Sequence, residues 1–131
     1  MRAKILNASA GSGKTYQLAY KYVRDVVEQP SIYRHILAVT FTNKATEEMK
    51  SRILKEIHLL ASGGESSYLE NLCRELDMDA ATVRRRAAEV RSKILHDYSR
   101  FTVLTIDTFF QRILRAFIKE LGIDLNYNVE I

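Results

Sequence analysis

The chain has 131 residues, of which 47% are hydrophobic and 27% charged, a composition that suits one globular domain with a core of its own. A single cysteine excludes an internal disulfide framework, and no apolar run reaches the length of a membrane span, so we expect a cytoplasmic protein with no membrane association. The net charge of +4 favours an anionic partner, for which ATP and nucleic acid both qualify.

Short apolar or β-branched segments are predicted to be buried strands at residues 4–6, 35–41 and 101–106. Apolar side chains recur at three- and four-residue steps over residues 18–27 and 45–57, which predicts a helix after each of the first two strands. Pro30 is expected to end the first of these helices. A third stripe, residues 109–121, is predicted to be a core helix closed by Gly122. This alternation is typical of a parallel α/β sheet flanked by helices.

The connection between the second and third predicted strands is long. Residues 61–67 have a loop composition, and residues 68–97 are predicted to be wholly helical with a charged outer face, so residues 62–99 are interpreted as a helical insertion. Between Ala80 and Lys119 nine lysines and arginines stand against three acids. Because three consecutive residues span most of a helix circumference, Arg84, Arg85 and Arg86 are read as a solvated face in preference to a phosphate-tracking surface.

Residues 8–15 read Ala-Ser-Ala-Gly-Ser-Gly-Lys-Thr, between the first predicted strand and the first predicted helix. Small residues let the backbone N–H groups turn inward around a polyphosphate, while Lys14 can reach the β- and γ-phosphates and the Thr15 hydroxyl can ligate Mg²⁺. The positive end of the following helix adds to the attraction. Ala8 stands where the Walker A pattern has Gly, a difference of one methyl group. The loop therefore predicts binding of a nucleoside triphosphate with Mg²⁺.

Residues 35–52 read HILAVTFTNKATEEMKSR, a buried strand that turns into a helix. This string closely resembles motif Ia of the superfamily 1 helicases. Together with the loop at residues 8–15 and the string TIDTFFQR at residues 105–112, the chain resembles the start of a UvrD/Rep-type motor, nearest to the RecB/AddA branch. The resemblance covers most of residues 3–121. It implies a P-loop NTPase fold of the RecA-like kind, with residues 1–131 as an incomplete first motor domain, 1A.

The resemblance also implies roles for individual residues. The nucleotide-binding set is Ala10, Gly11, Ser12, Gly13, Lys14, Thr15 and Tyr16, with Lys14 and Thr15 as catalytic residues and Thr15 as the Mg²⁺ ligand. The DNA-binding set is Thr40, Phe41, Thr42, Asn43, Lys44, Thr105 and Thr108. Phe41 offers a face on which any base can stack, although an aromatic residue at the end of a strand is also a common core residue.

Three residues admit structural interpretations or depart from the family pattern. Asn43 is a favoured N-cap residue for a helix that begins at Lys44. Asp107 stands where relatives usually have His, and its role is open between a loop acid, a cap and catalysis. Tyr16 stands where relatives often have Arg.

These observations imply the ATP-binding portion of an ATP-dependent DNA helicase or translocase that acts on single-stranded DNA in recombination or repair. ATP hydrolysis on a sheet of this type needs a carboxylate at the end of a later strand, which holds Mg²⁺ and orients the attacking water. The sequence has no apolar strand that ends in Asp-Glu, so we expect an N-terminal piece of a longer protein, with little ATPase activity by itself. The implied partners are single-stranded DNA, the remaining helicase domains and nuclease or recombination subunits. Two alternatives stay open: a P-loop kinase that phosphorylates a small molecule, and a non-enzymatic nucleic-acid-binding module.

Overall fold

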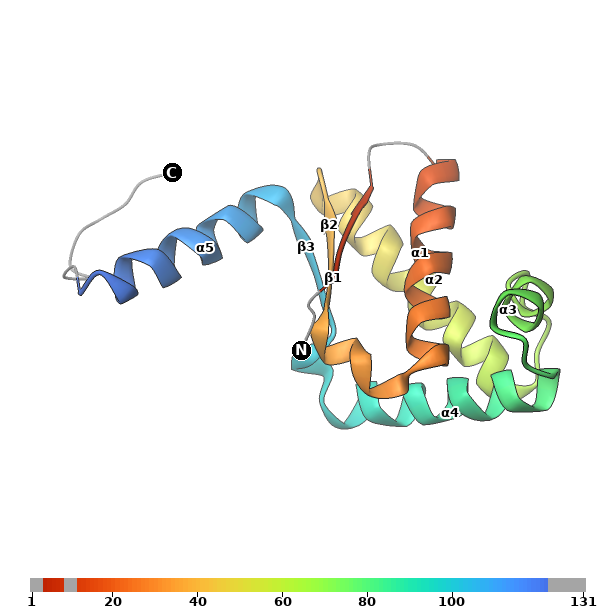
Figure 1. The fold of residues 1–131 in the computed structure, drawn as a ribbon. Helices are drawn as coiled ribbons and strands as arrows, with labels where there is room; N and C mark the ends of the chain where they lie inside the picture. The colour runs from red at the N-terminus through yellow and green to blue at the C-terminus, as the bar shows by residue number, and fades with distance from the viewer. Residues whose placement is uncertain (1–3, 9–11, 123–131) are drawn as a thin grey trace.

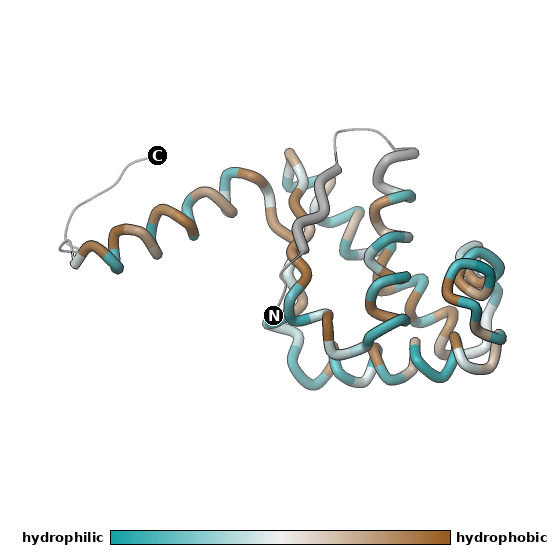
Figure 2. The backbone as a smooth tube through the Cα atoms, viewed as in Figure 1, coloured by the Kyte–Doolittle hydropathy of each residue, from teal (hydrophilic) through white to brown (hydrophobic). Residues whose placement is uncertain are grey.

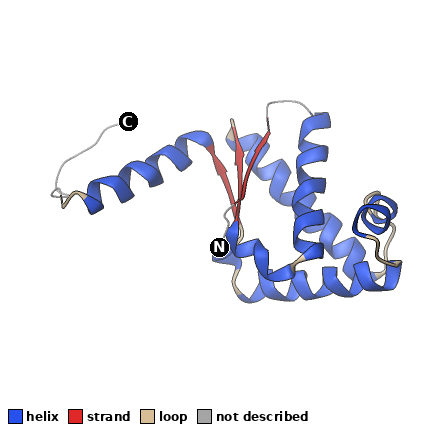
Figure 3. Cartoon of the chain, in the orientation of Figure 1, coloured by secondary structure: helices blue, strands red, loops and turns tan. Residues whose placement is uncertain are grey.

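The computed structural model describes residues 4–8 and 12–122, with side chains described from Tyr16 onward. A three-stranded parallel sheet forms its centre, in the order β1 (Lys4–Ala8), β2 (Ile36–Thr40) and β3 (Thr102–Thr105) (Figures 1 and 3). Each strand overlaps a segment predicted from the sequence. The predicted parallel α/β arrangement is therefore confirmed.

The helices follow the strands in chain order. They are α1 (Ser12–Glu28), the 3-10 helix η1 (Pro30–His35), α2 (Asn43–Ser62), α3 (Leu69–Leu76), α4 (Ala80–His96), the short 3-10 helix η2 (Tyr98–Arg100) and α5 (Ile106–Glu120). Pro30 opens η1 and so stops α1 two residues earlier, as predicted. Figure 1 shows α1 and α2 on one side of the sheet, with α4 packed across the lower ends of these two helices, while α5 leaves on the other side.

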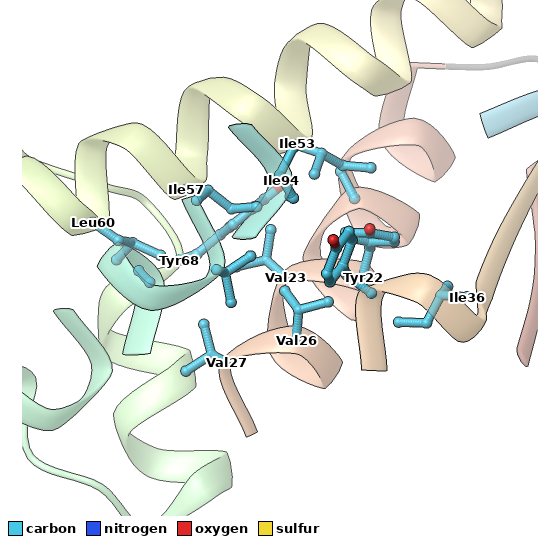
Figure 4. Packing of buried hydrophobic residues seen from close by; sticks show 14 of the residues in the cluster. Tyr22, Val23, Val26, Val27, Ile36, Ile53, Ile57, Leu60, Tyr68 and Ile94 are labelled. Carbon is cyan, nitrogen blue, oxygen red and sulfur yellow. The ribbon is translucent and has the colours of Figure 1, made fainter. Parts of the chain in front are cut away.

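The core lies between the sheet and these three helices. The stripes predicted on α1 and α2 both supply it, and Figure 4 shows Tyr22 and Val23 of α1 facing Ile53 of α2. From the sheet, Ile36 and Ala38 of β2 point into the same cluster. Buried apolar positions at helical spacing therefore set which face of α1 and of α2 packs on the sheet.

The β2–β3 connection holds α3 and α4, in the region predicted as a helical insertion. Residues 68–97, predicted to be wholly helical, form two helices with a break at residues 77–79. Asp77 takes a left-handed conformation with φ of 52°, and the Asp79 carboxylate accepts the Thr82 N–H at 2.7 Å as the N-cap of α4. The buried residues of α4 are Val83, Ala87, Val90 and Ile94, so this helix is part of the main core.

Two arginines of α4 bind the ends of other helices. The Arg84 guanidinium donates to the carbonyls of Leu59, Leu60 and Gly64 at 3.4, 3.1 and 3.1 Å, and the Arg86 guanidinium donates to the Glu28 carbonyl at 2.6 Å. The last carbonyls of a helix lack partners within the helix and carry partial negative charge, which an arginine satisfies well. The predicted solvated face is therefore wrong for Arg84 and Arg86; of the three, Arg85 is the one that is exposed.

The prediction that residues 109–121 form a core helix is wrong in part. These residues do form a helix, and Gly122 follows it with φ of 68°, as expected for a residue that closes a helix. No side chain of α5 is buried among the described residues, and Phe110 and Phe117 are 61% and 57% exposed. Figures 1 and 2 show the reason: α5 runs away from the sheet, so its apolar stripe meets little of the described chain.

Candidate functional site

The carboxyl ends of the three strands meet at one edge of the sheet. Ala8 is paired with Thr40, and Thr40 with Thr105, so the strands end in register. Neighbouring strands are about 4.8 Å apart, and a helix begins within a few residues of each of these ends. The end of β1 at Ala8, the residue 40–44 corner and the residue 105–108 corner therefore lie side by side, with the residue 40–44 corner in the middle.

The phosphate loop connects β1 to α1. Ala10 and Gly11 lie outside the described residues, and the side chains of Ser12, Lys14 and Thr15 are not described. The strand that ends at Ala8 and the helix that begins at Ser12 are both present, which is the context that the sequence pattern requires.

A hydroxyl network underlies the residue 40–44 corner. Thr40 is 1% exposed, and its hydroxyl lies 2.6 Å from that of Thr46 and donates to the Thr42 carbonyl at 3.2 Å. The Thr46 hydroxyl lies 3.1 Å from the same carbonyl and, while Thr40 donates there, gives its single proton to the Thr40 oxygen. The structure therefore places Thr40 beneath the corner, where its hydroxyl fixes the path of the backbone.

The next four residues are on the surface. Phe41 is 51% exposed, and Thr42, Asn43 and Lys44 are exposed as well. The Thr42 hydroxyl accepts the Ala45 N–H at 3.0 Å and is the N-cap of α2, so the predicted capping role of Asn43 is wrong. An aromatic ring, an amide and a cation are thus presented together on a corner with a fixed backbone.

The third corner is held by Thr105 and Thr108. The Thr105 hydroxyl accepts the Thr108 N–H at 3.3 Å as the N-cap of α5 and donates to the Thr108 hydroxyl at 3.0 Å. Asp107 is exposed in the first turn of α5, where the helix dipole favours a carboxylate. In the part of the chain that the structure describes, no group of three or more His, Cys, Asp or Glu residues could hold a metal ion.

Tyr16, in the first turns of α1, is bound by residues that the sequence analysis did not single out. Its hydroxyl donates to the Ser67 hydroxyl at 3.1 Å, and its backbone carbonyl accepts the Tyr68 hydroxyl at 2.9 Å. The Arg52 guanidinium lies over the Tyr16 ring, 5.4 Å from its centre. The four-residue spacing of Tyr16 and Tyr20 indicates a shared helix face, but nothing in the sequence connects that face to residue 68.

No helix within residues 12–122 combines the length and the apolar character needed to cross a membrane.

The fold and the site together define the class of the protein: an α/β domain with a parallel sheet whose capped, polar corners lie at the carboxyl edge, where open sheets of this kind bind ligands. The chain belongs to the family described as the UvrD/REP helicase N-terminal domain, whose family model matches residues 2–131. The family resemblance read from the sequence is thereby confirmed.

Individual relatives agree with this assignment. The chain is 29% identical over 126 residues to an ATP-dependent helicase/nuclease subunit of Lactobacillus delbrueckii subsp. bulgaricus, covering 95% of this chain and 9% of that protein. It is 30% identical over 142 residues to the RecBCD enzyme subunit RecB of Haemophilus influenzae, covering 93% of this chain and 11% of that protein. It is 29% identical over 119 residues to RecB of Escherichia coli, covering 85% of this chain and 10% of that protein. The chain thus spans about a tenth of the length of these relatives, and no solved structure matches it.

Proposed function

We propose that this chain is the ATP-binding portion of an ATP-dependent DNA helicase that moves along single-stranded DNA in recombination or repair. The observation that carries the proposal is the common register of the three strand ends, in which Ala8, the residue before the proposed phosphate loop, is paired with Thr40 at the start of the exposed corner. Membership of the helicase family supports this function over the kinase alternative, and the relatives are named as ATP-dependent helicase/nuclease and RecBCD subunits. A role on DNA also agrees with the cytoplasmic location expected from the sequence.

The nucleotide half of the site is residues 10–16. The first backbone N–H groups of α1 have no acceptor within the helix, and the sequence of this first turn includes Lys14 and Thr15. This donor set fits a polyphosphate with Mg²⁺: the N–H groups and Lys14 bind phosphate oxygens, and Thr15 is the protein ligand of the metal. Bound Mg²⁺ neutralises charge that develops on the phosphates during transfer.

The DNA half is the surface of the two neighbouring corners. Phe41 stacks on a base, an interaction that contributes about 1–3 kcal/mol and does not depend on base identity. Lys44 and Asn43 approach the backbone, and the Thr108 hydroxyl, which Thr105 holds in place, contacts a phosphate from the next corner. Thr40 supports the middle corner from below, because its hydroxyl is already bound within the protein. A motor that must step over any sequence needs contacts of this kind.

The remaining helicase domains complete the ATPase site, and nuclease or recombination subunits are the further partners. In this scheme ATP draws two sheet domains together and hydrolysis lets them part, so that alternating grip on the strand becomes directional movement. We expect the isolated 131-residue chain to bind Mg·ATP and to hydrolyse it slowly or not at all. Fast turnover stimulated by DNA in the purified chain contradicts this expectation.

The experiment measures binding of a fluorescent ATP analogue and of a labelled single-stranded oligonucleotide to the same chain. Lys14→Ala is expected to remove nucleotide binding, and Phe41→Ala to weaken DNA binding about tenfold, as the loss of one stacked base predicts. Tyr98→Ala is the matched control, because Tyr98 is 49% exposed but precedes β3 and so lies at the opposite edge of the sheet. Equal weakening by Phe41→Ala and Tyr98→Ala contradicts the proposed DNA surface, and a phosphorylated small-molecule product favours the kinase alternative.

A further inference from the structure

Three tyrosines form a cluster beside the first turns of α1. Tyr16 and Tyr20 lie one turn apart on this helix, and Tyr68 comes from the segment that leads into α3. The Tyr68 ring meets both of the others edge to face, with centres 5.0 Å from Tyr16 and 5.2 Å from Tyr20. Tyr68 is fully buried and is among the core residues drawn in Figure 4. Its ring is therefore held against the N-terminal half of α1.

Hydrogen bonds run in both directions across this contact. The Tyr68 hydroxyl donates to the Tyr16 carbonyl at 2.9 Å, and the Tyr16 hydroxyl donates to Ser67 at 3.1 Å. Burial raises the pKa of the Tyr68 hydroxyl, with the Arg52 guanidinium opposing the rise, so the group stays protonated and donates at neutral pH. The carbonyl that it holds belongs to the residue directly after Thr15.

The segment that carries Tyr68 is itself fixed. The Ser66 hydroxyl donates to the buried Glu56 carboxylate at 3.0 Å and accepts the Tyr68 N–H at 3.1 Å. Two residues earlier, the Gly64 carbonyl accepts a hydrogen bond from Arg84 of α4 at 3.1 Å. Residues 63–68, which we name the connecting segment, are therefore tied to α2 and α4 at one end and to α1 at the other.

We propose that Tyr68 is a positioning residue of the nucleotide site, through which the connecting segment and α4 fix the first turns of α1. This inference rests on the proposed function, because it assigns the affinity for Mg·ATP partly to a residue that does not touch the nucleotide. The physical reason is preorganisation: N–H donors that are already aimed at the phosphates lose less entropy when the ligand binds. Without the Tyr68 hydroxyl the Tyr16 carbonyl keeps only its bond within α1, so the start of this helix loses a tie to the connecting segment and that alignment weakens.

The test compares two variants that each remove one buried tyrosine hydroxyl and keep the ring. Tyr68→Phe removes the bond to the Tyr16 carbonyl. Tyr33→Phe is the matched control, because the Tyr33 hydroxyl is also bound to a backbone carbonyl, that of Lys93 at 3.2 Å, and Tyr33 is 1% exposed. For each, the Kd of a fluorescent ATP analogue with Mg²⁺ and the urea midpoint are measured on the full 131-residue chain.

We expect both variants to lower the urea midpoint by similar amounts, while Tyr68→Phe alone raises the Kd by about threefold to tenfold, the worth of one hydrogen bond. Ser67→Ala, which removes the acceptor of the Tyr16 hydroxyl, is expected to raise the Kd less. If the parent chain binds the analogue, Lys14→Ala does not, and Tyr68→Phe binds as the parent does, this inference fails while the proposed function stands. The inference also fails if Tyr33→Phe raises the Kd equally. A parent chain that binds no nucleotide overturns both.

Discussion

Replacing Thr40 by valine tests whether the Thr40 hydroxyl stabilises the fold or binds DNA. Valine has nearly the same shape, so the substitution leaves no cavity and removes only the hydroxyl. The group lost is 1% exposed and lies 2.6 Å from the Thr46 hydroxyl and 3.2 Å from the Thr42 carbonyl. A buried hydrogen bond contributes about 0.5–1.5 kcal/mol net, and a partner left unsatisfied costs more. Because Thr46 can still donate to the Thr42 carbonyl, at 3.1 Å, we expect a total loss of about 1–2 kcal/mol.

The assay is urea unfolding of the parent chain and of Thr40→Val, followed by circular dichroism. With a denaturant slope of about 1–3 kcal/mol per molar urea, the midpoint is expected to fall by about 1 M with the slope unchanged. Thr102→Val is the control, because Thr102 lies half-buried in the neighbouring strand and, among the described residues, its hydroxyl donates to the nearby Arg100 carbonyl alone, at 3.4 Å. This control is expected to stay within about 0.5 kcal/mol of the parent.

Binding of single-stranded DNA by Thr40→Val, compared with that of Lys44→Ala, then decides whether the Thr40 hydroxyl contacts DNA. Measured well below the unfolding transition, Thr40→Val is expected to bind a single-stranded oligonucleotide about as the parent does, whereas Lys44→Ala, which removes an exposed cation, binds more weakly and with a reduced salt dependence. An unchanged urea midpoint together with a large loss of DNA affinity refutes the reasoning, since it means that the Thr40 hydroxyl faces the strand.

Three further substitutions test single polar groups of the fold. Arg84→Met removes the donor to the carbonyls of Leu59, Leu60 and Gly64 and is expected to lower the free energy of unfolding in urea by about 1–2 kcal/mol. Arg85→Met, at the exposed neighbour, is expected to change this free energy little, and equal effects of the two substitutions contradict the capping role. Tyr22→Phe is expected to leave stability unchanged or raise it by up to about 1 kcal/mol, because the Tyr22 hydroxyl is buried without a hydrogen-bond partner among the described residues; a loss above about 1 kcal/mol points to a partner elsewhere. Asp79→Asn tests pH dependence. The Thr82 hydroxyl and N–H lower the pKa of Asp79, so its charged form stabilises the fold above about pH 4, and this contribution is lost as the pH falls through the lowered pKa. Asparagine still caps α4 but does not titrate, so the fall in urea midpoint between about pH 5 and about pH 2.5 is expected to be smaller in this variant, and an equal fall in both proteins excludes Asp79 as a contributor.

The sequence by itself determined the local structure and the family. Alternation of short apolar segments with three- and four-residue stripes was enough for the parallel sheet and for the buried faces of α1 and α2, because both patterns follow directly from backbone geometry. The Lys14 loop and the Thr40–Lys44 corner were found as strings of consecutive residues. Each string follows a predicted strand of one parallel sheet, and parallel strands have all their carboxyl ends on the same side.

The tertiary structure decided whether each predicted apolar stripe is buried and which residues far apart in the sequence make contact. The stripe on α5 has the same period as that on α1, but periodicity reports only that a helix has an apolar face, and α5 projects away from the described core. Arg84 and Arg85 are adjacent and identical in type, yet one binds the end of α2 and the other faces solvent, because the packing of α4 on α2 sets which residue reaches the carbonyls. The bond from Tyr68 to Tyr16 joins residues 52 positions apart, a distance over which no spacing rule operates. Contacts of this kind depend on how whole elements pack, and they hold the beginning of α1 where the phosphate loop ends.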